Sequence, residues 1–132
     1  MTAKILIVED NLDLVSLMKR ALEMSGYQVY MAVDGKKGMR AFYETRPDLV
    51  ILDVVMPYLD GFEVCQRIRE MADTPILMLT AKDSEEDILK AIELGADDYL
   101  SKTFDISVLL NHVRVLLEQG PTKSSKDSPT IN

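Results

Sequence analysis

Three short, largely apolar runs constrain the fold of this chain more than any other sequence feature. They occupy residues 4–8, 49–52 and 76–79, and none has the alternating polar residues of a half-buried strand. Uninterrupted runs of this length predict strands that are buried on both faces, as in a parallel sheet covered by helices. Two more polar segments, 27–31 and 97–100, are expected to form strands at the edges of that sheet.

Helical patterns separate the expected strands. Apolar residues at spacings of three, four and seven predict an amphipathic helix after the first strand and another near the C-terminus, and a shorter stripe predicts one after residue 60. These positions are Leu14, Leu17, Met18 and Ala21; Ile106, Leu109, Leu110 and Val113; and Val64, Cys65 and Ile68. Each helix is expected to cover one face of the sheet.

Residues that begin or end helices and strands agree with this alternation. Gly26 and Gly95 stand where helices should stop, and Pro47 and Pro75 precede the third and fourth strands. The segment 84–87 reads Ser-Glu-Glu-Asp, which resembles a helix capping box. The chain therefore alternates five strands with five helices.

Right-handed crossovers limit how such strands can be arranged. With the apolar strands in the centre, the order 2-1-3-4-5 fits, which is the flavodoxin-like, doubly wound α/β fold with helices on both faces of a parallel sheet. In this order the winding reverses between strands one and three, and a crevice opens there at the carboxyl ends of the strands. We expect the functional site in that crevice.

The length of 132 residues gives room for one domain. We expect this domain over residues 1–119. Residues 120–132 have no apolar periodicity, and we expect them to form a flexible tail or the start of an interdomain linker.

Composition and charge exclude several classes of function. The net charge of -7 argues against direct binding of nucleic acid, and no apolar run is long enough to span a membrane. The single Cys65 cannot form an internal disulfide, and the single His112 leaves little basis for histidine-dependent catalysis or multi-histidine metal sites. A cytoplasmic protein is expected.

Polar residues follow the central strands at the expected crevice. Glu9 and Asp10 follow the first strand, Asp53 the third, Thr80 the fourth and Lys102 the fifth. Three converging carboxylates repel one another, so a cation is expected among them. Oxygen ligands without histidine or thiolate favour Mg²⁺, with Mn²⁺ as an alternative.

This arrangement is typical of phosphoryl chemistry. Asp53, at the mouth of the crevice, can act as a carboxylate nucleophile that forms an acyl phosphate by in-line displacement. Glu9 and Asp10 would hold the metal. The ammonium group of Lys102 and the hydroxyl group of Thr80 would stabilise the phosphoryl oxygens.

The same residues resemble the receiver domain of two-component response regulators, most similarly those with winged-helix effectors. The resemblance spans about residues 3–118 and rests on four motifs together. These are Glu9-Asp10, the segment 53–57 with Gly61, Thr80-Ala81, and the segment 95–102 that ends in Lys102.

The resemblance implies a role for each site residue. Asp53 would accept a phosphoryl group from a sensor histidine kinase. Mg²⁺ would be held by Asp10, Asp53 and the backbone carbonyl of Val55, with Glu9 assisting. Thr80 and Tyr99 would form the switch pair, the hydroxyl group moving to the phosphoryl group and the ring turning inward. The domain would be a phosphoacceptor switch, at most catalysing its own phosphorylation and dephosphorylation, and not an enzyme with a separate substrate.

The chain departs from the family after its lysine, where Thr103 replaces the usual proline in a cis linkage. A cis bond to a residue other than proline costs about 2.5–4 kcal/mol, so we expect a trans bond, a rerouted loop and a displaced Lys102.

The resemblance also implies an output surface on the fourth helix, fifth strand and fifth helix, through which a homodimer is possible. Lys90, Asp97 and Asp98 fit the charge pairs usual at that interface, whereas Val108 and His112 stand where charged partners are usual.

Other functions fit the sequence less well. Neither glycine-rich nucleotide-binding motif is present, and a phosphatase that resembles haloacid dehalogenases would need a second aspartate where this chain has Val55. The remaining alternative is a receiver-like interaction module that works without phosphorylation. The retained carboxylate cluster argues against it, since clustered acids without a cation cost stability.

Overall fold

The computed structural model describes residues 2–81 and 85–121. It contains one parallel sheet with the strand order β2-β1-β3-β4-β5, which confirms the predicted topology. The strands are β1 (Lys4–Val8), β2 (Gln28–Ala32), β3 (Leu49–Asp53), β4 (Ile76–Thr80) and β5 (Asp98–Ser101). The two edge strands each lie one residue further along the chain than their sequence patterns predicted.

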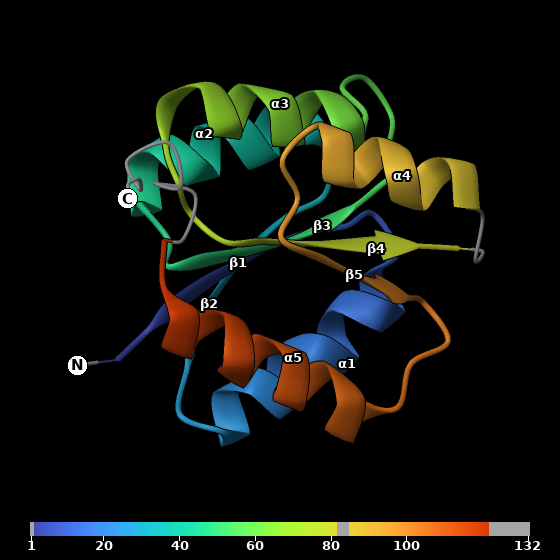
Figure 1. Ribbon diagram of the computed structural model, residues 1–132. Coiled ribbons are helices and arrows are strands. Elements are labelled where there is room, and N and C mark those ends of the chain that lie inside the picture. The colour runs from blue at the N-terminus through green and yellow to red at the C-terminus, as the bar shows by residue number, and fades with distance from the viewer. Residues whose placement is uncertain (1, 82–84, 122–132) are drawn as a thin grey trace, which may run out of the picture.

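Helices cover both faces of the sheet (Figure 1). They are α1 (Leu12–Met24), α2 (Gly35–Thr45), α3 (Gly61–Met71), α4 (Glu85–Glu93) and α5 (Ile106–Gln119). α1 and α5 lie on one face, and α2, α3 and α4 lie on the other. The chain therefore has the flavodoxin-like, doubly wound α/β fold that the sequence predicted.

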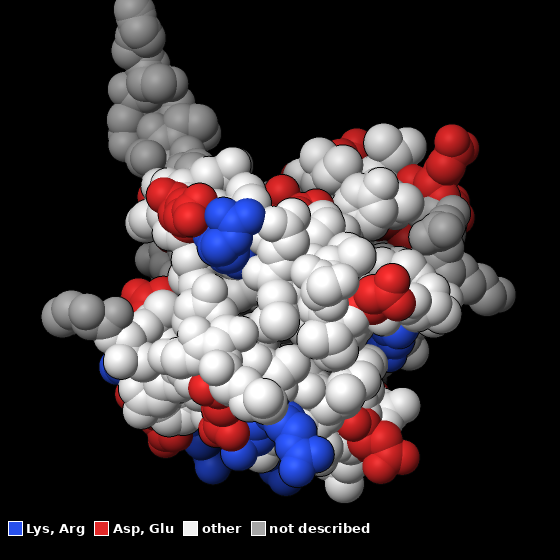
Figure 2. Space-filling model, turned by 90° about the horizontal axis from the view of Figure 1, so that it is seen from below, with Lys and Arg blue, Asp and Glu red and all other residues white. Residues whose placement is uncertain are grey.

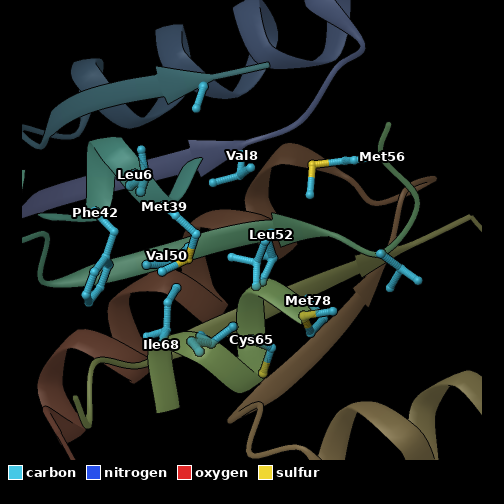
Figure 3. Packing of buried hydrophobic residues seen from close by; sticks show 14 of the residues in the cluster. Leu6, Val8, Met39, Phe42, Val50, Leu52, Met56, Cys65, Ile68 and Met78 are labelled. Carbon is cyan, nitrogen blue, oxygen red and sulfur yellow. The ribbon is translucent and has the colours of Figure 1, made fainter. Parts of the chain in front are cut away.

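Alternate residues of the central strands point into two separate cores. Leu6, Val50 and Met78 pack beneath α2 and α3, as Figure 3 shows for several members of this cluster. Ile7 and Ile51 point to the opposite face and pack against α1 and α5. Full burial of such a side chain contributes about 1.5–3 kcal/mol to the free energy of unfolding. Strands that are buried on both faces therefore stabilise the sheet that carries the crevice.

One helix face differs from the sequence prediction. In α1 the buried residues are Val15, Met18 and Leu22, whereas Leu17 is half exposed. Leu17 lies about 100° around the helix from Met18, so it falls outside the stripe that faces the sheet. The apolar spacing identified the helix but not its buried face.

Side-chain caps that the sequence analysis did not predict begin three helices, and the two predicted glycines follow the ends of two helices. The side chains of Asn11, Asp34 and Asp60 cap the N-termini of α1, α2 and α3. Gly26 and Gly95 follow α1 and α4 with positive φ angles. The capping box expected at 84–87 begins at a residue outside the described part of the chain.

Figure 2 shows the face of the molecule that α1 and α5 form. Its centre is largely uncharged, and basic side chains at its margins lie beside acidic ones. The face thus offers no continuous basic surface of the kind that nucleic acid binds. No helix among residues 2–81 and 85–121 combines the length and apolar character needed to cross a membrane.

Candidate phosphoacceptor site

The candidate site lies at the carboxyl ends of β1, β3 and β4, where the sequence placed it. Glu9 and Asp10 follow the end of β1, β3 ends in Asp53, and β4 ends in Thr80. Lys102 follows β5 directly. Parallel strands bring these ends to one side of the sheet, so residues far apart in the chain meet there.

Glu9 and Asp53 are both buried, and Asp10 is exposed at the rim. One carboxylate oxygen from each of the three residues lies within 4.8 Å of the other two. Glu9 accepts a hydrogen bond from the backbone N–H of Asn11 at 3.0 Å. Asp53 accepts one from the backbone N–H of Val55 at 3.3 Å.

Lys102 reaches into this cluster. Its Nζ lies 3.0 Å from Oδ2 of Asp53 and 3.2 Å from Oε1 of Glu9. The prediction that Lys102 is displaced is therefore wrong. The backbone explains why, because the N–H of Lys102 donates to the carbonyl of Thr80 at 2.8 Å and extends the pairing of β4 with β5.

The loop around Thr103 closes without proline. No cis peptide bond occurs among the described residues, in agreement with the expected trans bond. The hydroxyl groups of Ser101 and Thr103 form a hydrogen bond at 2.9 Å, and the N–H of Phe104 donates to the carbonyl of Ser101 at 3.1 Å. These bonds fold a tight turn that leaves Lys102 aimed at Asp53. No sequence signal considered above singled out this hydroxyl pair.

Burial sets the protonation of the site. It raises the pKa of Glu9 to about 7, with a further upward contribution from Asp53, against the opposing effects of Asn11 and Lys102. It also raises the pKa of Asp53, which the hydrogen bond and charge of Lys102 oppose. Burial alone would lower the pKa of Lys102, but the two carboxylates outweigh it and raise that pKa.

The charge balance of the site favours a bound cation. Among the described residues, three carboxylates face the ammonium group of Lys102, and the ligand atoms that they offer are all oxygens. Oxygen ligands in a compact acidic cluster suit a hard divalent ion such as Mg²⁺, which takes few protein carboxylates and retains several waters. The residues present therefore fit the metal that the sequence suggested.

Thr80 and the loop after β3 complete the mouth of the site. Thr80 is buried, and its Oγ1 has no hydrogen-bond partner among the described residues. Val55, two residues after Asp53, is exposed on the loop that ends at Gly61. A Cβ atom on Gly61 would lie 2.0 Å from the carbonyl oxygen of Asp53, so only glycine allows the loop to close this tightly.

Two other residues lie further from the cluster. Tyr99 is on β5 opposite Met78, two residues before the position paired with Thr80, and its side chain is partly exposed. His112 is half-buried on α5, and its Nδ1 lies 2.6 Å from Oδ2 of Asp98. His112 thus lies outside the carboxylate cluster.

The sequence analysis placed Asp97 among the residues that fit a charge pair between subunits, but its side chain is not available at the surface. Its carboxylate is buried and lies 2.9 Å from a guanidinium nitrogen of Arg69. The same carboxylate accepts the N–H of Ile76 at 2.9 Å. Asp97 therefore joins α3 to the start of β4 within one chain.

Comparison with known proteins agrees with this geometry. Residues 5–114 match the family model of the response regulator receiver domain. The chain belongs to this family. The acidic pocket of Glu9, Asp10 and Asp53 is typical of its phosphoacceptor site. A receiver domain is a phosphoacceptor switch, and it implies interaction with a histidine kinase.

Solved receiver structures are similar over most of the chain. A putative response regulator from Chloroflexus aurantiacus is 33% identical with a TM-score of 0.85, and the match covers 89% of this chain and 99% of that one. A chemotaxis protein from Vibrio cholerae is 32% identical with a TM-score of 0.82, covering 88% and 99%.

An OmpR/PhoB homolog from Thermotoga maritima is 32% identical with a TM-score of 0.84. The match covers 90% of this chain but only 54% of that protein, so the similarity extends over one part of a longer regulator.

Proposed function

We propose that this receiver domain accepts a phosphoryl group on Asp53 from a sensor histidine kinase and changes the surface formed by α4, β5 and α5 in response. The observation that carries the proposal is the contact of Asp53 with Lys102 inside a cluster of three carboxylates. This contact supports the proposal because it would bring the nucleophile, a positive charge and the candidate metal ligands together.

Asp53 must be ionised to attack phosphorus. Lys102 favours the ionised form, since its ammonium group lies 3.0 Å from Oδ2. A carboxylate oxygen of Asp53 forms the new bond to phosphorus as the bond from phosphorus to the kinase histidine nitrogen breaks. The electron pair of that bond stays on the imidazole, which takes up a proton, and Asp53 becomes an acyl phosphate.

Asp10, Asp53 and the carbonyl of Val55 would hold Mg²⁺, with Glu9 supporting them from the buried side. The ion would supply positive charge to the phosphoryl oxygens and lower the repulsion among the carboxylates. Lys102 would neutralise further charge on the transferred group.

Thr80 and Tyr99 would form the switch. Oγ1 of Thr80 has no partner among the described residues, so a phosphoryl oxygen on Asp53 would offer it one. Movement of Thr80 would free space behind it for the ring of Tyr99, which is partly exposed on β5. The same surface could then form a homodimer, with Lys90 and Asp98 at its margin.

Beryllofluoride, a small anion that mimics a phosphoryl group on a carboxylate, tests this function. With Mg²⁺ present, we expect amide NMR shifts around Asp53 and Thr80 that extend to Tyr99. Without Mg²⁺, or in Asp53→Asn, the shifts should be absent. Shifts that stop at Asp53 would refute the switch, and no shifts in the native protein would refute the site.

A further inference from the structure

A cationic patch lies on α2 and α3. Lys36, Lys37 and Arg40 project from α2, and Arg67 projects from α3. All four are exposed, and none makes an ion pair with another described residue. The patch is therefore locally positive on a chain whose net charge is -7.

Two exposed tyrosines accompany these cations. The side chain of Tyr43 on α2 is 54% exposed, and that of Tyr58 in the β3–α3 loop is 83% exposed. Tyr58 also has a φ of 70°, a left-handed conformation that disfavours a bulky side chain. A large aromatic ring held in solvent by a strained backbone indicates a surface that contacts something else.

These residues line two neighbouring hollows. A hollow of about 500 Å³ is bordered by Lys37, Tyr58 and the buried Asp34, and one of about 490 Å³ by Tyr43, Arg67 and the exposed Glu44. Lys36 and Arg40 border both hollows. We call this surface the α2 groove and define it by Lys36, Lys37, Arg40, Tyr43, Tyr58 and Arg67.

The walls of the α2 groove are fixed in place. A Cβ atom on Gly35 would lie 1.9 Å from the carbonyl oxygen of Leu59, so the start of α2 presses directly against the loop that carries Tyr58. Asp34 caps α2 by accepting the N–H of Lys37 at 2.8 Å. A rigid surface loses little conformational entropy on binding, which favours its use as an interface.

We propose that the α2 groove binds an acidic segment of a partner protein. Arginine and tyrosine are enriched in the residues that dominate protein interfaces, and the cations complement carboxylates. The groove continues past Tyr43 and Arg67 into a hollow bordered by Glu63 and Glu70. The segment therefore carries acidic residues at one end, an apolar residue over the tyrosines and basic residues at the other end.

This charge pattern disfavours other occupants. A nucleic acid backbone would meet Glu63 and Glu70 at one end of the groove and a net negative protein around it. A second copy of the chain would have to pair its Glu63 and Glu70 with these cations, and self-association without any probe distinguishes that case from a partner segment. The inference uses none of the residues of the carboxylate cluster and does not depend on phosphoryl transfer.

Fluorescence anisotropy with three labelled probes tests the proposal. The first is a short synthetic peptide with glutamates at one end, a central leucine pair and lysines at the other end. The second carries lysines in place of the glutamates, and the third is a single-stranded oligothymidine. We expect the first peptide to bind at least about tenfold more tightly than either other probe.

Two variants with the same charge change identify the surface. Arg40→Glu should weaken binding of the first peptide about tenfold, whereas Arg20→Glu on α1 should change it less than about twofold. Tyr58→Gly should also weaken binding while leaving Tm unchanged or higher, since glycine tolerates the left-handed backbone. A loss of binding through misfolding would instead lower Tm.

Four results would overturn the proposal, the last of them self-association. The first is no binding of the acidic peptide by the native protein, and the second is equal weakening by Arg40→Glu and Arg20→Glu. The third is tighter binding of the oligothymidine, which would assign the groove to nucleic acid. Self-association of the native protein that Arg40→Glu abolishes, seen by sedimentation without any probe, would assign the groove to a second copy.

Discussion

The ammonium group of Lys102 lies 3.0 Å from Oδ2 of Asp53, although Asp53 ends β3, Lys102 follows β5, and β4 lies between these two strands. The contact depends on the turn from Ser101 to Phe104, which directs the side chain back over the sheet. It gives the buried Asp53 a counter-charge before any phosphoryl group or cation binds.

The raised pKa of Glu9 predicts how stability varies with pH in the absence of metal. With a folded-state pKa of about 7 and an ordinary value of 4.5, the folded protein binds more protons than the unfolded chain between these values. The contribution of Glu9 to the free energy of unfolding is complete below about pH 4.5 and is lost as the pH rises through about 7.

Glu9→Gln should therefore raise the free energy of unfolding at pH 8 by roughly 2 kcal/mol and have little effect at pH 4. Urea denaturation in a chelator at both pH values measures this difference. Glu70→Gln, at an exposed position on α3, is the control and should change little. An equal effect of Glu9→Gln at both pH values would contradict the role of burial.

Mg²⁺ should stabilise the folded protein through the carboxylate cluster. At a concentration tenfold above Kd, binding adds about 1.4 kcal/mol to the free energy of unfolding, which appears as a higher Tm. Asp10→Ala should lose most of this increase, and Asp13→Ala, in the first turn of α1, should retain it. The same increase in native protein and Asp10→Ala would exclude the metal site.

Thr80→Val should make the protein more stable and impair its switch. The buried hydroxyl group of Thr80 has no partner among the described residues, so its removal should raise the free energy of unfolding by about 1 kcal/mol. Urea denaturation measures this gain, and NMR with beryllofluoride should show no shift at Tyr99. A less stable Thr80→Val would mean that the hydroxyl group is already satisfied.

The buried pair of Arg69 and Asp97 should be essential to stability. Arg69 also donates to the carbonyls of Gly95, Ala72 and Thr74. Arg69→Met should cost about 3 kcal/mol or more, because it removes the guanidinium group that faces the buried Asp97 carboxylate. Arg114→Met removes only an exposed pair with Glu118 and should cost less than about 1 kcal/mol. Similar losses in the two variants would be inconsistent with this assignment.

The sequence predicted the features that depend on local pattern. The apolar runs at 4–8, 49–52 and 76–79 identified the central strands, and crossover rules then supplied their order. The site followed, since Glu9, Asp53 and Thr80 stand directly after those strands. These inferences needed only the geometry of a parallel sheet.

Features that depend on tertiary packing were harder to predict. Leu17 belongs to an apolar stripe, yet the position of α1 on the sheet buries Val15 instead. Thr103 suggested a displaced lysine, but the hydroxyl pair with Ser101 shapes the turn and Lys102 remains in place. Asp97 looked like a surface charge because nothing near it in the sequence indicates its partner Arg69.

Intact mass spectrometry after incubation with phosphoramidate tests the central claim most directly. The experiment compares the native protein with and without Mg²⁺ and with Asp53→Asn. We expect one added phosphoryl group on the native protein, dependent on Mg²⁺ and absent from Asp53→Asn. A phosphoryl adduct of equal yield on Asp53→Asn, or no adduct on the native protein with Mg²⁺, would contradict the assignment of Asp53 as the phosphoacceptor.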